Sequence, residues 1–188
     1  MTKDPKHLIL PGIIAIILPT LAFTFGGLIP GMVFVFAFVG GLIFYILTLW
    51  RTRIDATRIL VPYLLTVILF IVHVYEEYLT HFEVTVTKMS GFEVSQFVLL
   101  TIAAFMAPIM WTAGAIFMLK RWRFGDFFLC TFFFAMLLAE LTHYIFPFVI
   151  DGTFHYESGM YTAFLPLIPA AYGLRQMLLA LNQARQAA

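Results

Sequence analysis

Residues 59–81 of this chain, ILVPYLLTVILFIVHVYEEYLTH, decide its fold class. Their first fourteen positions carry no charge, and the apolar run has about the 20 residues that an α-helix needs to cross a bilayer. The far end of the run then gathers His73, Glu76, Glu77 and His81. Carboxylates and imidazoles are unfavourable at membrane depth unless they are paired, protonated or bound to a metal. The stretch therefore predicts a transmembrane helix with a functional site at one end.

The rest of the chain repeats the apolar part of this pattern. Apolar residues make up 62% of the 188 positions and charged residues only 11%. They fall in runs too long for the core of a soluble protein, at about residues 8–28, 30–50, 59–79, 94–119, 127–150 and 161–181. We therefore expect an all-α polytopic transmembrane helix bundle of six spans, forming a single domain over residues 1–188. Because only the glycine-rich residues 26–31 separate the first two runs, we expect a tight helical hairpin there, with a re-entrant element as the alternative.

The basic residues indicate how the spans are oriented. If each run crosses once, ten of the eleven Lys and Arg residues fall on one side, and only Lys88 falls on the other. The positive-inside rule assigns the more basic side to the cytoplasm. The sequence therefore predicts that both termini are cytoplasmic. The ten residues are Lys3, Lys6, Arg51, Arg53, Arg58, Lys120, Arg121, Arg123, Arg175 and Arg185.

A second polar group lies in the fifth run. Glu140 and His143 are three residues apart, so they share one face of a helix. At about 1.5 Å of rise per residue, Glu140 and His73 both lie roughly 20 Å from the cytoplasmic boundary. The polar residues at the end of the third run are spaced by three or four and also share one side of their helix. Both groups are therefore predicted to face one pocket in the outer half of the bilayer.

The residue types in this predicted pocket are those that bind transition metals. Helical bundles that hold two metal ions use Glu-x-x-His pairs, and this chain has one such pair together with the reversed order His73-Val-Tyr-Glu76. We expect a divalent transition metal, zinc or iron, as one ion or two. Glu76 and Glu77 are the predicted catalytic residues. The predicted metal ligands are His73, Glu76, Glu77, His81, Glu140, His143 and His155.

Each of these residues also has a simpler interpretation. Buried His and Glu side chains can form a structural network of shared protons that joins the third and fifth spans. His81 lies where the third span should leave the membrane, so solvation at the interface explains it as well as metal binding does. His155 lies in the short outer loop before the last span and becomes a ligand only if this loop folds back as a lid.

A nucleic-acid partner and an internal disulfide find no support in the sequence. The net charge is +1 and no long basic run is present, so nothing indicates a nucleic-acid partner. The single cysteine, Cys130, has no partner in the chain, which excludes an internal disulfide. The expected partners are the lipid bilayer and a lipid or other hydrophobic small molecule.

The order of the motifs resembles a known family. His73-Val-Tyr-Glu76-Glu77 is similar to the signature of the membrane protein family named for its HxxEE motif. The resemblance covers roughly residues 59–173, and Ser158 and Glu140 depart from the pattern of that family. Since no reaction is assigned to the family, the resemblance implies a site and no activity. The downstream elements that follow the family's order are Glu140-Leu-Thr-His143, a Tyr156-x-x-Gly159 turn, Thr162-Ala163, and a last span with Pro166 and Pro169.

Three functions fit such a site. The first is a metalloenzyme, a hydrolase or oxidoreductase, that acts on a lipid or other hydrophobic substrate in the outer half of a bacterial-type inner or plasma membrane. The second is a metal-free acid/base lipid isomerase, because His73, Glu77 and Glu140 have a layout similar to that of the emopamil-binding sterol isomerases. The third is a proton- or cation-coupled transporter or receptor. A full conduction path is disfavoured, since the cytoplasmic halves of the spans contain few ionisable residues.

Overall fold

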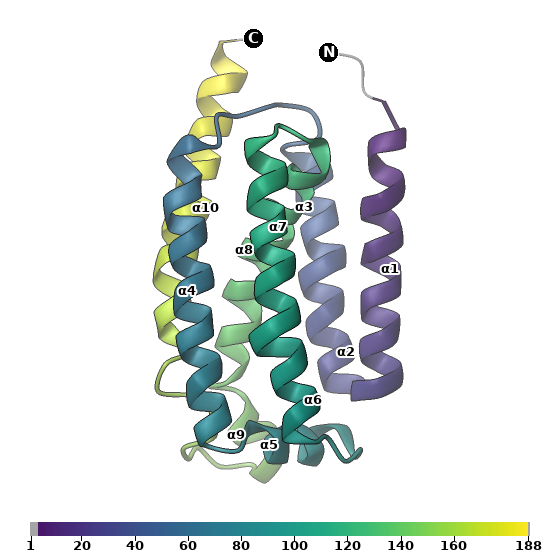
Figure 1. Ribbon diagram of the computed structural model, residues 1–188, viewed down its shortest axis with the longest axis vertical. Coiled ribbons are helices and arrows are strands. Elements are labelled where there is room, and N and C mark those ends of the chain that lie inside the picture. The colour runs from purple at the N-terminus through teal and green to yellow at the C-terminus, as the bar shows by residue number, and fades with distance from the viewer. Residues whose placement is uncertain (1–3, 188) are drawn as a thin grey trace.

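The computed structural model describes residues 4–187, and over this range the protein is a bundle of antiparallel helices (Figure 1). Six helical stretches among the described residues are long and apolar enough to cross a membrane, which confirms the predicted all-α bundle of six spans. Lys3 and the last residue of the predicted domain, Ala188, lie outside the described residues.

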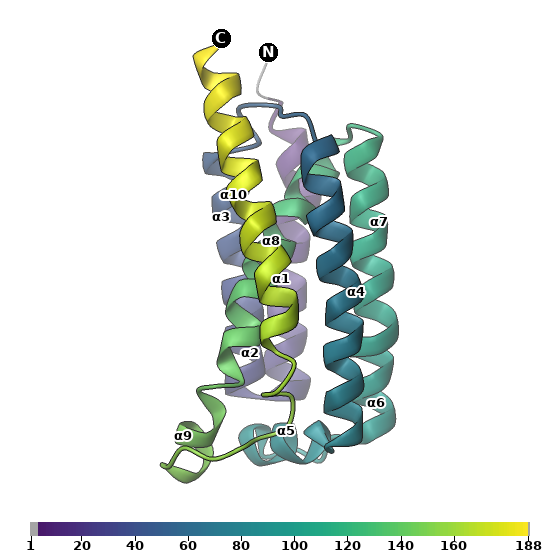
Figure 2. The same ribbon diagram turned by 90° about the vertical axis from the view of Figure 1, so that its left-hand side faces the viewer.

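Four of the six spans are continuous α-helices, and two contain a π-helical segment. The continuous spans are α1 (Lys6–Gly26), α4 (Thr57–Leu79), α8 (Arg123–Thr142) and α10 (Phe164–Gln186). The second span consists of α2 (Leu28–Phe34), the π-helix Val35–Gly40 and α3 (Gly41–Leu47). The fourth consists of α6 (Gln96–Leu100), the π-helix Thr101–Met106 and α7 (Ala107–Leu119). Two short helices, α5 (Phe82–Ser90) and α9 (Phe146–Asp151), lie at one end of the bundle (Figure 2).

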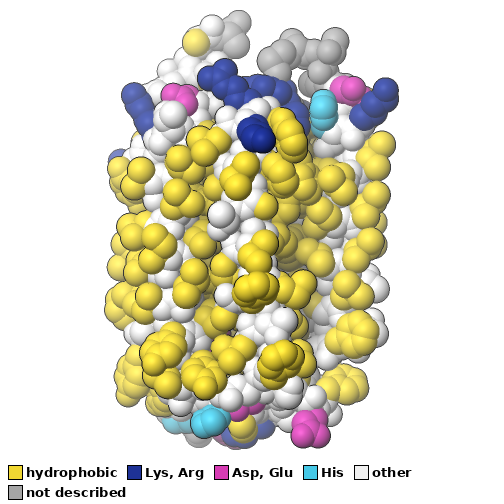
Figure 3. Space-filling model, viewed as in Figure 1, with side chains coloured by type: hydrophobic (Ala, Val, Ile, Leu, Met, Phe, Trp, Pro, Cys, Tyr) yellow, Lys and Arg dark blue, Asp and Glu magenta, His cyan; other side chains and the backbone are white. Residues whose placement is uncertain are grey.

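The two ends of the bundle differ in charge. Lys and Arg side chains gather at the end that carries the chain termini, which we call the basic end, and apolar side chains cover the surface between the ends (Figure 3). The opposite end carries α5, α9 and the predicted site residues, and we call it the His/Glu end. Lys88, in α5, belongs to this end, as the sequence predicts. Which end faces the cytoplasm stays a prediction.

α8 lies at the centre of the bundle. Of its most apolar stretch 61% is buried, compared with 17% for α1. The ring of Phe132 lies 4.3 Å from that of Tyr63 in α4 and 5.0 Å from that of Trp111 in α7, between centroids. Gly41 brings the second span close to α8, because a Cβ at this position would lie 2.6 Å from the Cα of Thr131. α7 and α10 pack against both α8 and α4, and aromatic rings of α8 and α4 meet between them. α4 and α8 carry His73, Glu77 and Glu140 of the predicted site.

The connection between the first two spans is a tight turn, as expected. Gly27 joins α1 to α2 with a φ of 81°, a left-handed conformation that favours glycine. α1 and the second span then run antiparallel (Figure 1). The structure therefore has a helical hairpin here and no re-entrant element among these residues.

The fifth apolar run, predicted as one span over residues 127–150, is two helices. α8 ends at Thr142, and the next three amides bond to carbonyls only three residues back, from His143 to Glu140 at 3.3 Å and from Ile145 to Thr142 at 2.8 Å. Pro147 then supplies the first turn of α9, where a missing N–H is tolerated. The predicted end of the fifth span at residue 150 is wrong. Both helices are apolar, so hydropathy does not reveal the tight turn that separates them.

Candidate functional site

Four ionisable side chains meet inside the His/Glu end of the bundle. His73 and Glu77 lie four residues apart near the end of α4. Glu140 lies in the last turn of α8, and His143 is the first residue after that helix. All four are buried, with exposed fractions of 1% for His73, 2% for Glu140, 5% for His143 and 6% for Glu77. We call these four residues the buried cluster. The polar residues of the third and fifth spans therefore meet in one site, as the sequence predicts.

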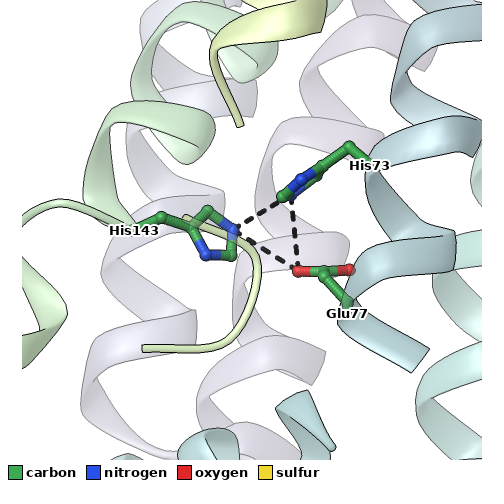
Figure 4. A group of neighbouring side chains, drawn as sticks. All are labelled: His73, Glu77 and His143. Atoms are coloured by element: carbon green, nitrogen blue, oxygen red, sulfur yellow. Dashed lines mark hydrogen bonds and ion pairs between the residues drawn. The ribbon is translucent and has the colours of Figure 1, made fainter. Parts of the chain in front are cut away.

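The ring nitrogens of the two histidines point at each other and at the carboxylates. The Nε2 atoms of His73 and His143 are 3.2 Å apart. Glu77 Oε1 lies 3.4 Å from His143 Nε2 and 3.6 Å from His73 Nε2 (Figure 4). Glu140 Oε2 lies 2.9 Å from His73 Nε2. This oxygen is buried and has no hydrogen-bond partner among the described residues. Four donor atoms thus converge on one small volume.

The spacing of three of these atoms matches a metal site. Zinc bonds to His nitrogen and carboxylate oxygen are about 2.0–2.1 Å long, so neighbouring ligand atoms of a tetrahedral site lie about 3.3 Å apart. The triangle formed by the two Nε2 atoms and Glu77 Oε1 has sides of 3.2, 3.4 and 3.6 Å. The three atoms therefore form one face of such a tetrahedron without rearrangement.

The hydrogen bond made by the second nitrogen of His143 defines which nitrogen is protonated. His143 Nδ1 lies 3.0 Å from the backbone carbonyl oxygen of Ser158, and a carbonyl can only accept. Nδ1 must therefore carry the hydrogen. In the neutral ring, Nε2 then presents a lone pair to the centre of the buried cluster.

A longer chain of hydrogen bonds gives the same result for His73. Its Nδ1 lies 3.0 Å from the hydroxyl oxygen of Thr162, and this hydroxyl donates its hydrogen to Glu76 Oε2. Since Thr162 has a single hydroxyl hydrogen, its oxygen must accept from Nδ1–H of His73. Nε2 of the neutral ring is again a lone pair. Two lone pairs and two carboxylates now face one another, an arrangement that requires a cation between them, a metal ion or shared protons.

Glu76 lies behind His73 and outside the group of converging atoms. Its Oε1 accepts from the Tyr156 hydroxyl at 2.8 Å and from the Tyr161 amide at 3.1 Å, and its Oε2 accepts from the Thr162 amide at 2.6 Å. Burial and the hydrogen bond to Glu76 raise the pKa of Tyr156 to about 12, so the phenol stays a donor. Glu76, predicted as a catalytic residue and metal ligand, therefore anchors the loop and is the final acceptor of the hydrogen-bond chain from His73.

Two other predicted ligands are also separate from the buried cluster. α4 ends at Leu79, so the four-residue spacing no longer applies at His81, which has a left-handed φ of 61° and bonds Glu83 at 2.9 Å on the surface. His155 lies in the loop after α9, between Asp151 and Glu157. Its hydrogen bond to Glu157 raises its pKa. The structure thus assembles four of the seven predicted ligands and leaves three outside.

The loop between α9 and α10, residues 152–163, covers the buried cluster. Gly159 passes over both imidazoles with a φ of 87°, and a Cβ there would lie 2.6 Å from His143 Cε1 and 3.0 Å from His73 Cε1. Phe82 of α5 and Phe146 of α9 close the remaining side, with ring centroids 4.9 and 5.3 Å from that of His143. The loop therefore folds back over the buried cluster, the condition under which His155 was expected to be a ligand, but it contacts the histidines through its backbone and Thr162 and not through His155.

The positioning roles of Ser158, Thr162 and Gly159 were not predicted from the sequence. The only signal for two of them was the resemblance, which includes the Tyr-x-x-Gly turn and the Thr-Ala pair. Comparison with protein families, with curated proteins and with solved structures finds no match to this chain. Membership of the HxxEE family therefore stays a prediction.

Proposed function

We propose that this protein is a membrane-embedded enzyme that binds a divalent transition metal, zinc or iron, at the buried cluster. His73, Glu77 and His143 are its ligands, and the substrate is a lipid or another hydrophobic molecule. The observation that carries the proposal is the pair of Nε2 lone pairs, 3.2 Å apart and facing Glu77 Oε1. Both imidazoles are held in this protonation state by hydrogen bonds that Nδ1–H donates, which is how metal-binding histidines are usually oriented.

The chain's own residues have distinct roles in this proposal. Thr162 and the Ser158 carbonyl orient the two imidazoles, and the charge of Glu76 strengthens His73 as a ligand through Thr162. Glu140 Oε2, which no described residue satisfies, is the group best placed to take up a proton or to complete the ligand set. A metal bound here supplies Lewis-acid activation of water or of a substrate oxygen.

The surroundings of the buried cluster favour a hydrophobic substrate. The cluster lies at the end of helices whose lateral surface is apolar (Figure 3). Tyr75 and Tyr78, in the same turns of α4 as His73 and Glu77, are exposed on the outside of the helix. A molecule dissolved in the bilayer reaches this depth without crossing water. With the basic end in the cytoplasm, as the positive-inside rule indicates, the reaction takes place in the outer half of the membrane.

The contact between His73 and Glu140 favours a second candidate, a metal-free acid/base isomerase. Their 2.9 Å separation allows one proton to be shared between the imidazole and the carboxylate. In this case the cation that the two lone pairs require is a proton. The two candidates differ in one measurable property, the metal content.

Metal analysis of the purified full-length protein tests the proposal. After supplementation with Zn²⁺ or Fe²⁺ and dialysis, we expect His143→Ala and the more conservative Glu77→Gln each to hold one equivalent of metal less than the wild type. His81→Ala is the matched control, because this histidine also pairs with a glutamate at the same end of the bundle but on the surface. The same metal content in the wild type and in both variants, with helical content intact, would contradict the metal proposal and leave the isomerase.

A further inference from the structure

One of the histidines at the surface of the His/Glu end, His155, lies between two carboxylates. His155 Nε2 is 3.2 Å from Asp151 Oδ2, at the end of α9, and 3.0 Å from Glu157 Oε1, in the loop. One ligand atom from each residue lies within 4.8 Å of the other two. We call Asp151, His155 and Glu157 the lid cluster. It shares no residue with the buried cluster.

Each donor of the lid cluster is oriented by a further contact. His155 Nδ1 lies 3.1 Å from the carbonyl oxygen of Thr153, so Nδ1 carries the hydrogen and Nε2 of the neutral ring faces the two carboxylates. Glu157 uses its other oxygen, Oε2, to accept from the Thr85 hydroxyl of α5 at 2.7 Å. Its Oε1 is therefore turned towards His155 and Asp151. The orientation of an imidazole and a carboxylate by second hydrogen bonds repeats what is found in the buried cluster.

The charges in this region favour a cation. Asp151 and Glu157 contribute two negative charges, and Lys88 of α5, which shares a cavity of about 410 Å³ with Asp151, contributes one positive charge. The sum is negative. The N···O separations of 3.0 and 3.2 Å are close to the spacing of about 3.3 Å expected around a tetrahedral zinc ion.

We propose that the lid cluster is a second divalent-cation site, for an ion such as Zn²⁺, which binds from the aqueous side. The ion joins three parts of the chain, namely α9 through Asp151, the loop through His155 and Glu157, and α5 through the Glu157–Thr85 hydrogen bond. It thereby holds the loop whose residues Ser158 and Thr162 orient the buried imidazoles. This site does not depend on the enzymatic function proposed above, because its ligands are separate.

The alternative is a lid cluster that holds only a proton, with a charged His155 bridging two carboxylates. Solvent exposure does not distinguish a bound metal from a bridging proton. The side-chain exposed fractions, 48% for Asp151, 38% for His155 and 10% for Glu157, fit either form. A direct titration with metal is therefore required.

Titration of the full-length protein in detergent with Zn²⁺, followed by calorimetry, tests the site. We expect His155→Ala and Asp151→Asn to weaken one binding event at least tenfold, and His143→Ala to leave this event unchanged. Lys88→Met should strengthen it by removing a like charge. His81→Ala is the control and should have no effect.

The proposal would be overturned if every zinc-binding event were the same in the wild type, His155→Ala and Asp151→Asn, or if no saturable binding occurred outside the buried cluster. The second result identifies the proton-bridged form. Loss of binding in His143→Ala alone bears on the buried cluster and not on this site. Failure of the two proposals is therefore distinguishable.

Discussion

The buried cluster and the lid cluster are built alike but lie in different surroundings. In both, Nδ1–H donates a hydrogen bond, which leaves an Nε2 lone pair facing carboxylate oxygens. The exposed fraction of His73 is 1%, while the side chain of His155 is 38% exposed. In the lid cluster, water can solvate the carboxylates when no cation is bound. In the buried cluster water cannot reach the carboxylates. Their negative charge must therefore be balanced by a bound cation.

The comparison also separates the sources of order in the two clusters. α4 and α8, packed through the aromatic core, position the buried cluster, and the loop only orients the rings. The lid cluster consists of two loop residues and the last residue of the short helix α9. Changes to the loop should therefore alter the ring orientation in the buried cluster but remove the lid cluster altogether.

The largest expected effect comes from Gly159→Ala. The new Cβ would lie within 3.0 Å of both imidazoles, so the loop must move away and release the contacts from Ser158 and Thr162. We expect zinc affinity at the buried cluster to fall about 100-fold, the upper end for loss of such orienting contacts. Metal titration and thermal unfolding measure the change.

Gly152→Ala is the matched control for this variant. Gly152 lies in the same loop with a φ of 72°, but a Cβ there has nothing within 4 Å. It carries only the left-handed backbone strain, about 1 kcal/mol. Equal losses of metal affinity in the two variants would show that strain, and not contact with the imidazoles, causes the effect.

The next effect should come from Thr162→Val, which removes the hydroxyl between His73 and Glu76 at nearly constant volume. Because His73 Nδ1 then loses its acceptor, we expect metal affinity at the buried cluster to fall roughly 10-fold or more. Thr162→Ser keeps the hydroxyl and should restore affinity. Thr101→Val is a control in the fourth span, where the hydroxyl bonds only to Phe97 of its own helix. A normal affinity in Thr162→Val would remove the hydrogen-bond chain from the account.

A smaller effect is expected from Glu76→Gln. The amide keeps the size of the side chain, but its NH₂ group cannot accept the hydrogen bonds that one carboxylate oxygen now accepts from Thr162 or Tyr161. We expect hydrogen exchange of the amides of residues 161 and 162 to become about tenfold faster, which corresponds to roughly 1.4 kcal/mol. Metal should remain bound, since Glu76 lies outside the buried cluster. Complete loss of metal would instead make Glu76 a ligand.

The smallest effect is expected from His81→Ala, which removes an exposed histidine that pairs with the mostly buried Glu83. Such surface pairs contribute about 0–1 kcal/mol. Thermal unfolding and metal content should both stay near the wild-type values. A clear loss of metal would show instead that α4 extends beyond Leu79 in the membrane and that His81 is a ligand.

Periodicity carried most of what the sequence predicted. Spans of about 20 apolar residues are visible without any structure, and a spacing of four on α4 places His73 and Glu77 on one face. Similar depth in adjacent spans then brings Glu140 to His73, and their contact is present at 2.9 Å. These inferences hold because a regular helix transmits position from residue to residue.

The inferences fail where the helices end. His81 follows the last residue of α4 by two positions and takes a left-handed conformation, so helical spacing no longer applies to it. The contacts of Ser158 and Thr162 depend on how the loop 152–163 folds back, which no periodicity specifies. Glu76 shows a different limit, because neighbouring side chains on one side of a helix can serve different partners. It turns to the loop while Glu77 turns inward.

The most direct test of the buried cluster is X-ray absorption spectroscopy of zinc bound to the His155→Ala variant, in which the lid cluster is disabled. We predict one equivalent of zinc with nitrogen and oxygen neighbours at about 2.0–2.1 Å and the outer-shell scattering of two imidazoles, those of His73 and His143. A spectrum without imidazole scattering, or a protein that retains no zinc, would contradict a metal site at the buried cluster.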